Sequence, residues 1–169
     1  MNLRDLLKDR PADRLAERVT AAAYGTILVL SSLALLKSDN VSSGLGWELV
    51  TGVGLATWAA HLFAEVVGDH VRKGSAIDSK ELTQAVVDGV PILLATVPPA
   101  VILLLGRLDV LDASVALWSA LIVAMLQLVG VGALAGAAVS TSRRGPWAYA
   151  AVTAIFGLAV VTMKVVLTH

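Results

Sequence analysis

The sequence contains no cysteine among its 169 residues, which excludes disulfides, thiolate metal sites and a cysteine nucleophile. Aromatic residues make up only 5% of the chain, and no basic tract is interleaved with them, so nothing indicates nucleic-acid binding. The G-x-S-x-G and H-E-x-x-H motifs and phosphate-cradling glycine loops are also missing, so no motif nominates an enzyme. Only His61 lies within a long apolar run, whereas haem held between helices normally takes two buried histidines, so no cofactor is expected.

Charge is scarce as well. Charged residues are 15% of the chain against 57% hydrophobic residues, and the mean hydropathy is +0.79. A soluble domain of this size has no room to bury so much apolar surface. Because the charges gather in short clusters between long uncharged runs, the sequence predicts a multi-pass helical membrane protein whose main partner is the lipid bilayer.

Five apolar runs are long enough to cross a bilayer, and they predict an all-α fold, a five-helix transmembrane bundle over residues 19–167. A charged segment of mixed sign precedes them over residues 1–18 and predicts a short amphipathic arm at the membrane surface. The predicted spans cover about residues 19–36, 47–67, 85–105, 113–139 and 147–163.

The distribution of lysine and arginine predicts how the bundle is oriented. The arm, the loop after the second span and the turn after the fourth span lie on one side of a five-span protein and hold ten of these residues. The other side holds three, namely Lys37, Arg107 and Lys164. We therefore expect a protein of the inner (plasma) membrane. By the positive-inside rule, its N-terminus lies in the cytoplasm and its C-terminus lies outside.

The second span has two distinct faces when it is wound as a helix. Thr51, Trp58, His61 and Glu65 form a polar face, which should turn towards protein or water because hydrocarbon rejects ionisable groups. Small residues every four positions form the other face and should let a neighbouring backbone approach closely. These packing residues are Gly52, Ala56, Ala60 and Ala64. Since both faces need neighbours, we expect this helix at the centre of the bundle.

A second packing motif lies in the fourth span. Gly132 and Gly136 are spaced four residues apart within an uncharged run. This spacing is typical of helices that pack closely in membranes.

Four polar residues reach similar depths in the cytoplasmic half of the predicted bundle. They are Tyr24 of the first span, His61 and Glu65 of the second, and Asp88 of the third. At 1.5 Å per residue, their depths agree to within about two helical turns. We therefore predict a candidate polar cluster made of these four residues.

Four interpretations of this cluster stay open, and one of them is an enzymatic or other function that no motif nominates. His61 and Glu65 can bond each other or nearby hydroxyls and simply fix the helix packing. A histidine beside a carboxylate can also relay protons, which would suit a proton or cation pathway. A metal site is the third interpretation, but His61 and Glu65 supply only two ligands, so that the rest would have to come from Asp88 or a second chain. We therefore assign no metal.

Two short segments carry a resemblance to known proteins. AAAYGTILVL at residues 21–30 and WAAHLFAE at residues 58–65 contain the motifs YGT and WxxHxFAE. These segments resemble small bacterial multi-pass membrane proteins that carry no assigned activity. The resemblance implies a membrane bundle and points to Tyr24, Thr26, Trp58, His61 and Glu65, but it implies no substrate.

The sequence therefore favours a non-enzymatic integral membrane protein that acts through helix packing. It would be a structural or assembly subunit whose partner is a second copy of itself or another membrane protein. The alternative is a small proton or cation channel or transporter that uses the intramembrane His61, Glu65 and Asp88 cluster.

Overall fold

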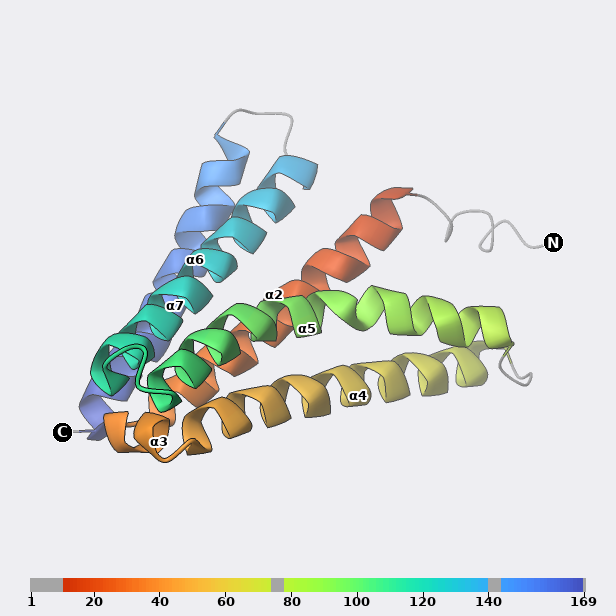
Figure 1. Ribbon diagram of the computed structural model, residues 1–169. Helices are drawn as coiled ribbons and strands as arrows, with labels where there is room; N and C mark the ends of the chain where they lie inside the picture. The colour runs from red at the N-terminus through yellow and green to blue at the C-terminus, as the bar shows by residue number, and fades with distance from the viewer. Residues whose placement is uncertain (1–10, 74–77, 140–143, 169) are drawn as a thin grey trace.

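The computed structural model describes residues 11–73, 78–139 and 144–168, and it is an all-α bundle of five long helices and one short helix (Figure 1). The predicted fold class is therefore confirmed. The helices are α2 (Pro11–Leu35), α3 (Ser38–Ser42), α4 (Leu45–Lys73), α5 (Ser79–Arg107), α6 (Ala113–Val139) and α7 (Gly145–Thr168).

Each of the five long helices contains a stretch that is long and apolar enough to cross a membrane. These stretches overlap the five predicted spans, and their bounds are Leu15–Leu35, Leu45–Gly68, Leu82–Arg107, Ala113–Ala138 and Gly145–Met163. The α5 helix continues through its three internal prolines, Pro91, Pro98 and Pro99.

The start of α2 differs from the predicted boundary between arm and span. The helix begins at Pro11 and continues through residue 18 into the apolar stretch. Proline is favoured in the first turn of a helix because its missing N–H would have no partner there, and no other proline or glycine interrupts residues 12–18. Residues 11–18 are therefore the first two turns of a membrane-length helix, and residues 1–10 of the predicted arm lie outside the described residues.

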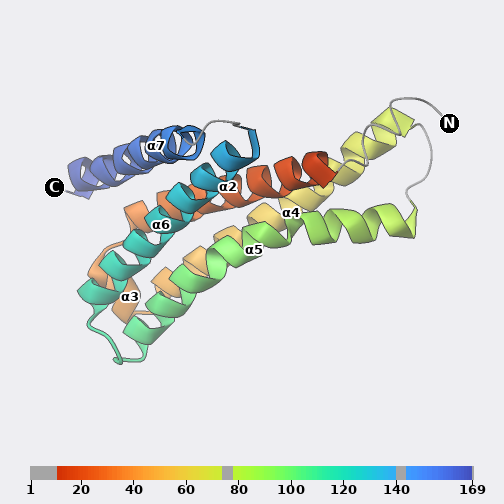
Figure 2. The same ribbon diagram turned by 90° about the horizontal axis from the view of Figure 1, so that it is seen from above.

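The helix at the centre of the bundle is α2, which corrects the prediction that α4 would be central. The α2 helix packs against α4, α5, α6 and α7, whereas α4 packs against α2, α3 and α5. In the membrane-length stretch of α2, 44% of the residues are buried, whereas in that of α4 only 17% are buried. Seen from above, α4 and α5 run beside α2, and α7 lies at the opposite edge (Figure 2).

The apolar core is concentrated at one end of the bundle, beside α3. We call this the core end. Its larger buried side chains come from α2, α3, α4, α5 and α6 and from Leu36 directly after α2, and the others are Val29, Leu30, Leu33, Val41, Val50, Leu103, Leu117, Leu121 and Leu128. Val160 and Val161 of α7 pack against this cluster.

The opposite end, where α2 and α5 begin and α4 ends, is less tightly closed, and we call it the open end. The α4/α5 hairpin and the α6/α7 hairpin diverge towards it, with α2 between them (Figure 1). The buried apolar residues in this half of α2 and α5 are Ala21, Ala85 and Ile92. Because most of these side chains are small, hydrophobic packing holds the open end more weakly than the core end.

The predicted turn at residues 37–46 contains the short helix α3. The backbone N–H of Lys37 donates to Oδ1 of Asn40 at 2.8 Å, which satisfies a free donor at the start of this helix. After it, Gly44 adopts a φ of +91°, and the guanidinium of Arg107 donates to the backbone oxygen of Ser43. This contact ties the end of α5 to the α3 turn and closes the core end.

Candidate functional site

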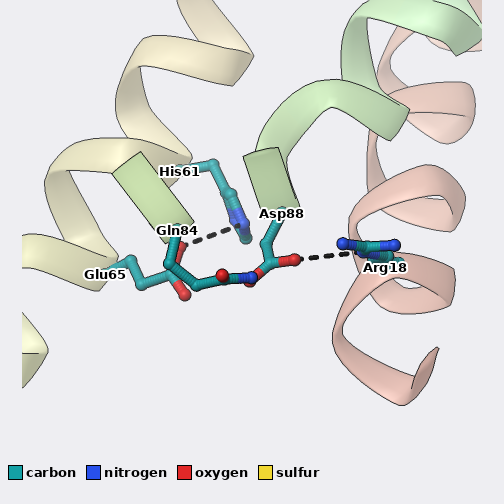
Figure 3. Close-up of polar contacts among 5 residues, drawn as sticks. All are labelled: Arg18, His61, Glu65, Gln84 and Asp88. Atoms are coloured by element: carbon teal, nitrogen blue, oxygen red, sulfur yellow. Dashed lines mark hydrogen bonds and ion pairs between the residues drawn. The ribbon is translucent and has the colours of Figure 1, made fainter. Parts of the chain in front are cut away.

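The candidate site is centred on Asp88, whose side chain is only 3% exposed, inside the α5 helix near the open end (Figure 3). Nε of Arg18, on α2, donates to Oδ1 of Asp88 at 3.0 Å. Nε2 of Gln84, one turn before Asp88 on α5, donates to its Oδ2 at 2.7 Å. Both carboxylate oxygens therefore accept a hydrogen bond, and a cation accompanies the buried charge, as a carboxylate at this depth requires.

A glycine beside Asp88 lets α4 come close to α5. A Cβ on Gly89 would lie 2.9 Å from Cδ1 of Trp58 and 3.5 Å from Cδ2 of His61. Only a residue without a side chain leaves room for the indole ring at this distance. Gly89 thus allows the polar face of α4 to lie next to Asp88.

The polar face of α4 turns towards the bundle, as the sequence predicts. Thr51, Trp58, His61 and Glu65 are all half-buried. Nε2 of His61 lies 3.8 Å from Oε2 of Glu65, one turn apart on the helix. This separation is longer than a hydrogen bond, so the contact is an electrostatic one whose strength depends on whether the histidine carries a proton.

Three carboxylates from three different helices converge at this site. Single oxygens of Glu17, Glu65 and Asp88 lie within 4.8 Å of one another. The guanidinium of Arg18 contacts one of these carboxylates, that of Asp88. Oxygen ligands of this kind suit a hard divalent cation such as Mg²⁺ or Ca²⁺. Such a cation would have to compete with Arg18 and Gln84 for the oxygens of Asp88.

The structure brings together three of the four residues of the predicted cluster. His61, Glu65 and Asp88 lie side by side (Figure 3), but Tyr24 is 53% exposed and takes no part in the site. Its predicted place in the cluster is wrong because depth along a helix does not determine the direction of a side chain. Tyr24 lies on the outer face of α2, whereas its neighbours Gly25 and Thr26 are buried.

Sequence reasoning missed three members of the site, namely Glu17, Arg18 and Gln84. Glu17 and Arg18 were assigned to a surface arm, although α2 runs unbroken through them. The available signal was helical spacing: Gln84 precedes Asp88 by four residues, which places both on one face of α5.

The predicted packing residues of α4 lie on its outer surface. Gly52, Ala56, Ala60 and Ala64 are all exposed, and no described atom beyond the helix backbone lies within 4 Å of a Cβ built on Gly52. The prediction that this face packs inside the bundle is therefore wrong. Close packing uses Gly54 instead, where a Cβ would overlap the side chain of Thr96.

Gly132 and Gly136 lie against α7. This helix is the close neighbour that the predicted packing motif requires. A Cβ on Gly132 would overlap the side chain of Thr153. A Cβ on Gly136 would lie 2.7 Å from the backbone oxygen of Gly145 and from Cα of Pro146. At these two positions the absence of a side chain allows α6 and α7 to pack closely.

The fold and the site together describe an all-α bundle of five membrane-length helices with a charged contact between three of them. No protein-family model, curated protein or solved structure matches this chain. The physical arrangement of the residues therefore carries the argument about function.

Proposed function

We propose that this chain is an integral membrane protein that acts as a structural or assembly subunit through helix packing. The observation that carries the proposal is the outward face of α4. Its four small residues are exposed in a helix that is itself buried over only 17% of its membrane-length stretch. Faces of small residues spaced four apart are typical of helix–helix interfaces in lipid, where close backbone approach drives association.

A second copy of this chain is the partner that fits this face. All copies share one orientation in the membrane, so two α4 helices can meet in parallel across a two-fold axis. The stripe formed by Gly52, Ala56, Ala60 and Ala64 then meets itself along its whole length. The inward face of α4 is already occupied by α2 and α5, so the outward face is the one left for a partner.

We also propose that the open end faces the cytoplasm in the inner membrane of a bacterial cell. In the sequence, ten of the 13 lysine and arginine residues lie before or at the start of the apolar stretch of α2, or between the apolar stretches of α4 and α5 or of α6 and α7, and the positive-inside rule places such segments in the cytoplasm.

The packing of the core end favours a structural role rather than transport through a single copy of the chain. Its interior is filled with large apolar side chains such as Leu30, Leu33 and Leu103. The buried hydroxyls of Ser32 and Thr96 donate to backbone oxygens of their own helices, at 2.8 and 2.9 Å. The charged site thus faces an apolar core along the bundle axis, where an ion would lose its hydration without replacement.

Replacing Ala60 with leucine is expected to weaken self-association by at least about tenfold, equivalent to about 1.4 kcal/mol, because the larger side chain holds the two helices apart. The measurement is energy transfer between donor-labelled and acceptor-labelled protein in liposomes over a range of protein-to-lipid ratios. The matched control is Ala151→Leu, the same change at an exposed position of α7. Self-association that is absent, or that both variants weaken equally, contradicts the proposal.

A second candidate function is a proton or cation pathway, which the convergence of Glu17, Glu65 and Asp88 favours. Carboxylates that share a site in a membrane can hold a cation or exchange a proton with a neighbouring histidine such as His61. This function would require a route past the core end, either between copies or through a second conformation.

Reconstituted protein would then carry protons or cations across liposomes, and the double variant His61→Ala with Glu65→Gln would abolish the flux. The measurement is the fluorescence of a pH-sensitive dye, or of a cation-sensitive one, trapped in the vesicles. The matched control is Tyr24→Phe, which alters an exposed residue outside the site. Flux equal to that of empty liposomes excludes this second function and leaves the assembly proposal standing.

A further inference from the structure

Among the described residues of the open end, Arg18 of α2 and Asp88 of α5 form an ion pair that joins α2 to the α4/α5 hairpin. Arg18 and Asp88 are 70 residues apart in sequence, and their side chains meet at 3.0 Å (Figure 3). The buried apolar residues nearest to them on α2 and α5 are alanines, Ala21 and Ala85. Alanine buries little apolar area, so an ion pair at this place contributes a large share of the attraction between the helices.

We propose that the Arg18–Asp88 pair is a latch that holds α2 against the α4/α5 hairpin, and that its release widens the open end while the core end stays packed. This inference goes beyond the proposed assembly function. It concerns motion within one copy, whereas the assembly proposal concerns the outer face of α4.

The two partners of the latch differ in a way that permits release. The Arg18 side chain is 46% exposed, so that its guanidinium can leave the pair and remain hydrated or reach headgroups. Asp88 is buried but keeps Gln84 as a donor on its own helix after Arg18 departs. Each group then keeps a polar partner, and this lowers the free energy cost of the released state.

The charged groups around the latch come from each of the three helices that meet there. Glu17 and Arg18 belong to α2, His61 and Glu65 to α4, and Asp88 to α5. Glu17 and Glu65 bring two further carboxylates close to Asp88, and repulsion among the carboxylates opposes the attraction between Arg18 and Asp88. Loss of Arg18 therefore removes this attraction and leaves the repulsion among the three carboxylates.

The core end provides the hinge for this motion. Arg107 ties the end of α5 to the α3 turn, and large buried side chains of α2 and α5, including Leu33 and Leu103, pack in one cluster. A packed core of this kind resists deformation, whereas at the open end the described Arg18–Asp88 pair joins α2 to α5 among small buried side chains.

Distances between pairs of spin labels test the latch, and the lack of native cysteine makes each introduced pair unique. The open-end pair is Leu15→Cys on α2 with Leu82→Cys on α5, and both positions are exposed. The core-end control pair is Leu35→Cys with Val101→Cys, exposed positions on the same two helices. We expect Arg18→Met to lengthen and broaden the distance distribution of the open-end pair alone, in liposomes.

Two further variants decide between a latch and a general loss of structure. Asp88→Asn keeps the shape of the side chain but removes its charge, and it should widen the open end as Arg18→Met does. Arg18→Lys keeps the positive charge and should preserve the original distance distribution. The latch is ruled out if the open-end distance stays unchanged in both Arg18→Met and Asp88→Asn, or if the core-end pair changes as much as the open-end pair.

Discussion

Replacing Gly136 with valine is expected to lower the free energy of unfolding by about 3 kcal/mol, at the upper end of what overpacking normally costs. The atoms that a side chain would meet at Gly136 are the backbone oxygen of Gly145 and Cα of Pro146, each 2.7 Å from a Cβ. Backbone atoms in a helix cannot rotate away as the end of a flexible side chain can. The α6/α7 hairpin must therefore separate to accept the new side chain.

The same helix offers a matched control for this substitution. Gly130 also lies within α6 but is exposed, and no described atom beyond the helix backbone lies within 4 Å of a Cβ built there. Gly130→Val should change the free energy of unfolding by no more than about 0.5 kcal/mol, as exposed substitutions generally do. Both variants carry the same change in helix propensity, so their difference isolates the packing of α6 against α7.

The measurement is reversible unfolding in mixed micelles, followed by far-ultraviolet circular dichroism as the fraction of denaturing detergent rises. Equal stabilities for Gly136→Val and Gly130→Val would show that α6 and α7 do not pack through Gly136. A loss in Gly136→Val with no loss in Gly130→Val would show that they do.

The sequence was sufficient to predict the number and place of the membrane-length helices. A run of about 20 apolar residues satisfies the bilayer whatever its neighbours are, so this property is local. The inward turn of His61 and Glu65 was also predictable, because hydrocarbon penalises an ionisable group on any helix. Asp88 could be placed near them because residue counts along three helices give similar depths.

The packing of particular helix faces was not predictable in the same way. The stripe of Gly52, Ala56, Ala60 and Ala64 follows the same spacing rule as Gly132 and Gly136, yet it lies on the outside of the bundle. Lipid accepts small apolar residues as readily as another helix does, so spacing alone cannot tell an internal contact from an external one. The prediction for Tyr24 is wrong for a related reason, because its depth along α2 does not determine the direction in which its side chain points.

Glu17 and Arg18 show a different limit of sequence reasoning. Charged residues at the start of an apolar span look like a solvated lead-in, because most such residues are solvated. Their role at Asp88 depends on the direction in which α2 crosses α5, which is a property of the whole bundle. The charge of Asp88 itself was the one local hint that a cation had to lie nearby.

Replacing Arg18 with methionine is expected to lower the free energy of unfolding by about 3 kcal/mol, the lower end of the cost of breaking a buried ion pair. The lower end applies because Arg18 is 46% exposed, whereas Asp88 is 3% exposed and keeps its charge in a buried place. Asp88→Leu should cost only about 1 kcal/mol, since the released guanidinium can reach water or headgroups. The same detergent titration measures both variants.

The double variant Arg18→Met with Asp88→Leu tests whether the cost comes from a buried carboxylate that has lost its cation and keeps only the neutral donor Gln84. Two apolar side chains of similar size can pack together at the open end, and replacing a buried ion pair in this way is often neutral. The double variant should therefore be destabilised by about 1 kcal/mol, roughly 3 kcal/mol less than the sum of the single changes, which is within the range for residues in contact. Additive losses would mean that Arg18 and Asp88 act independently, and the contact between α2 and α5 would then have to rest on their apolar residues.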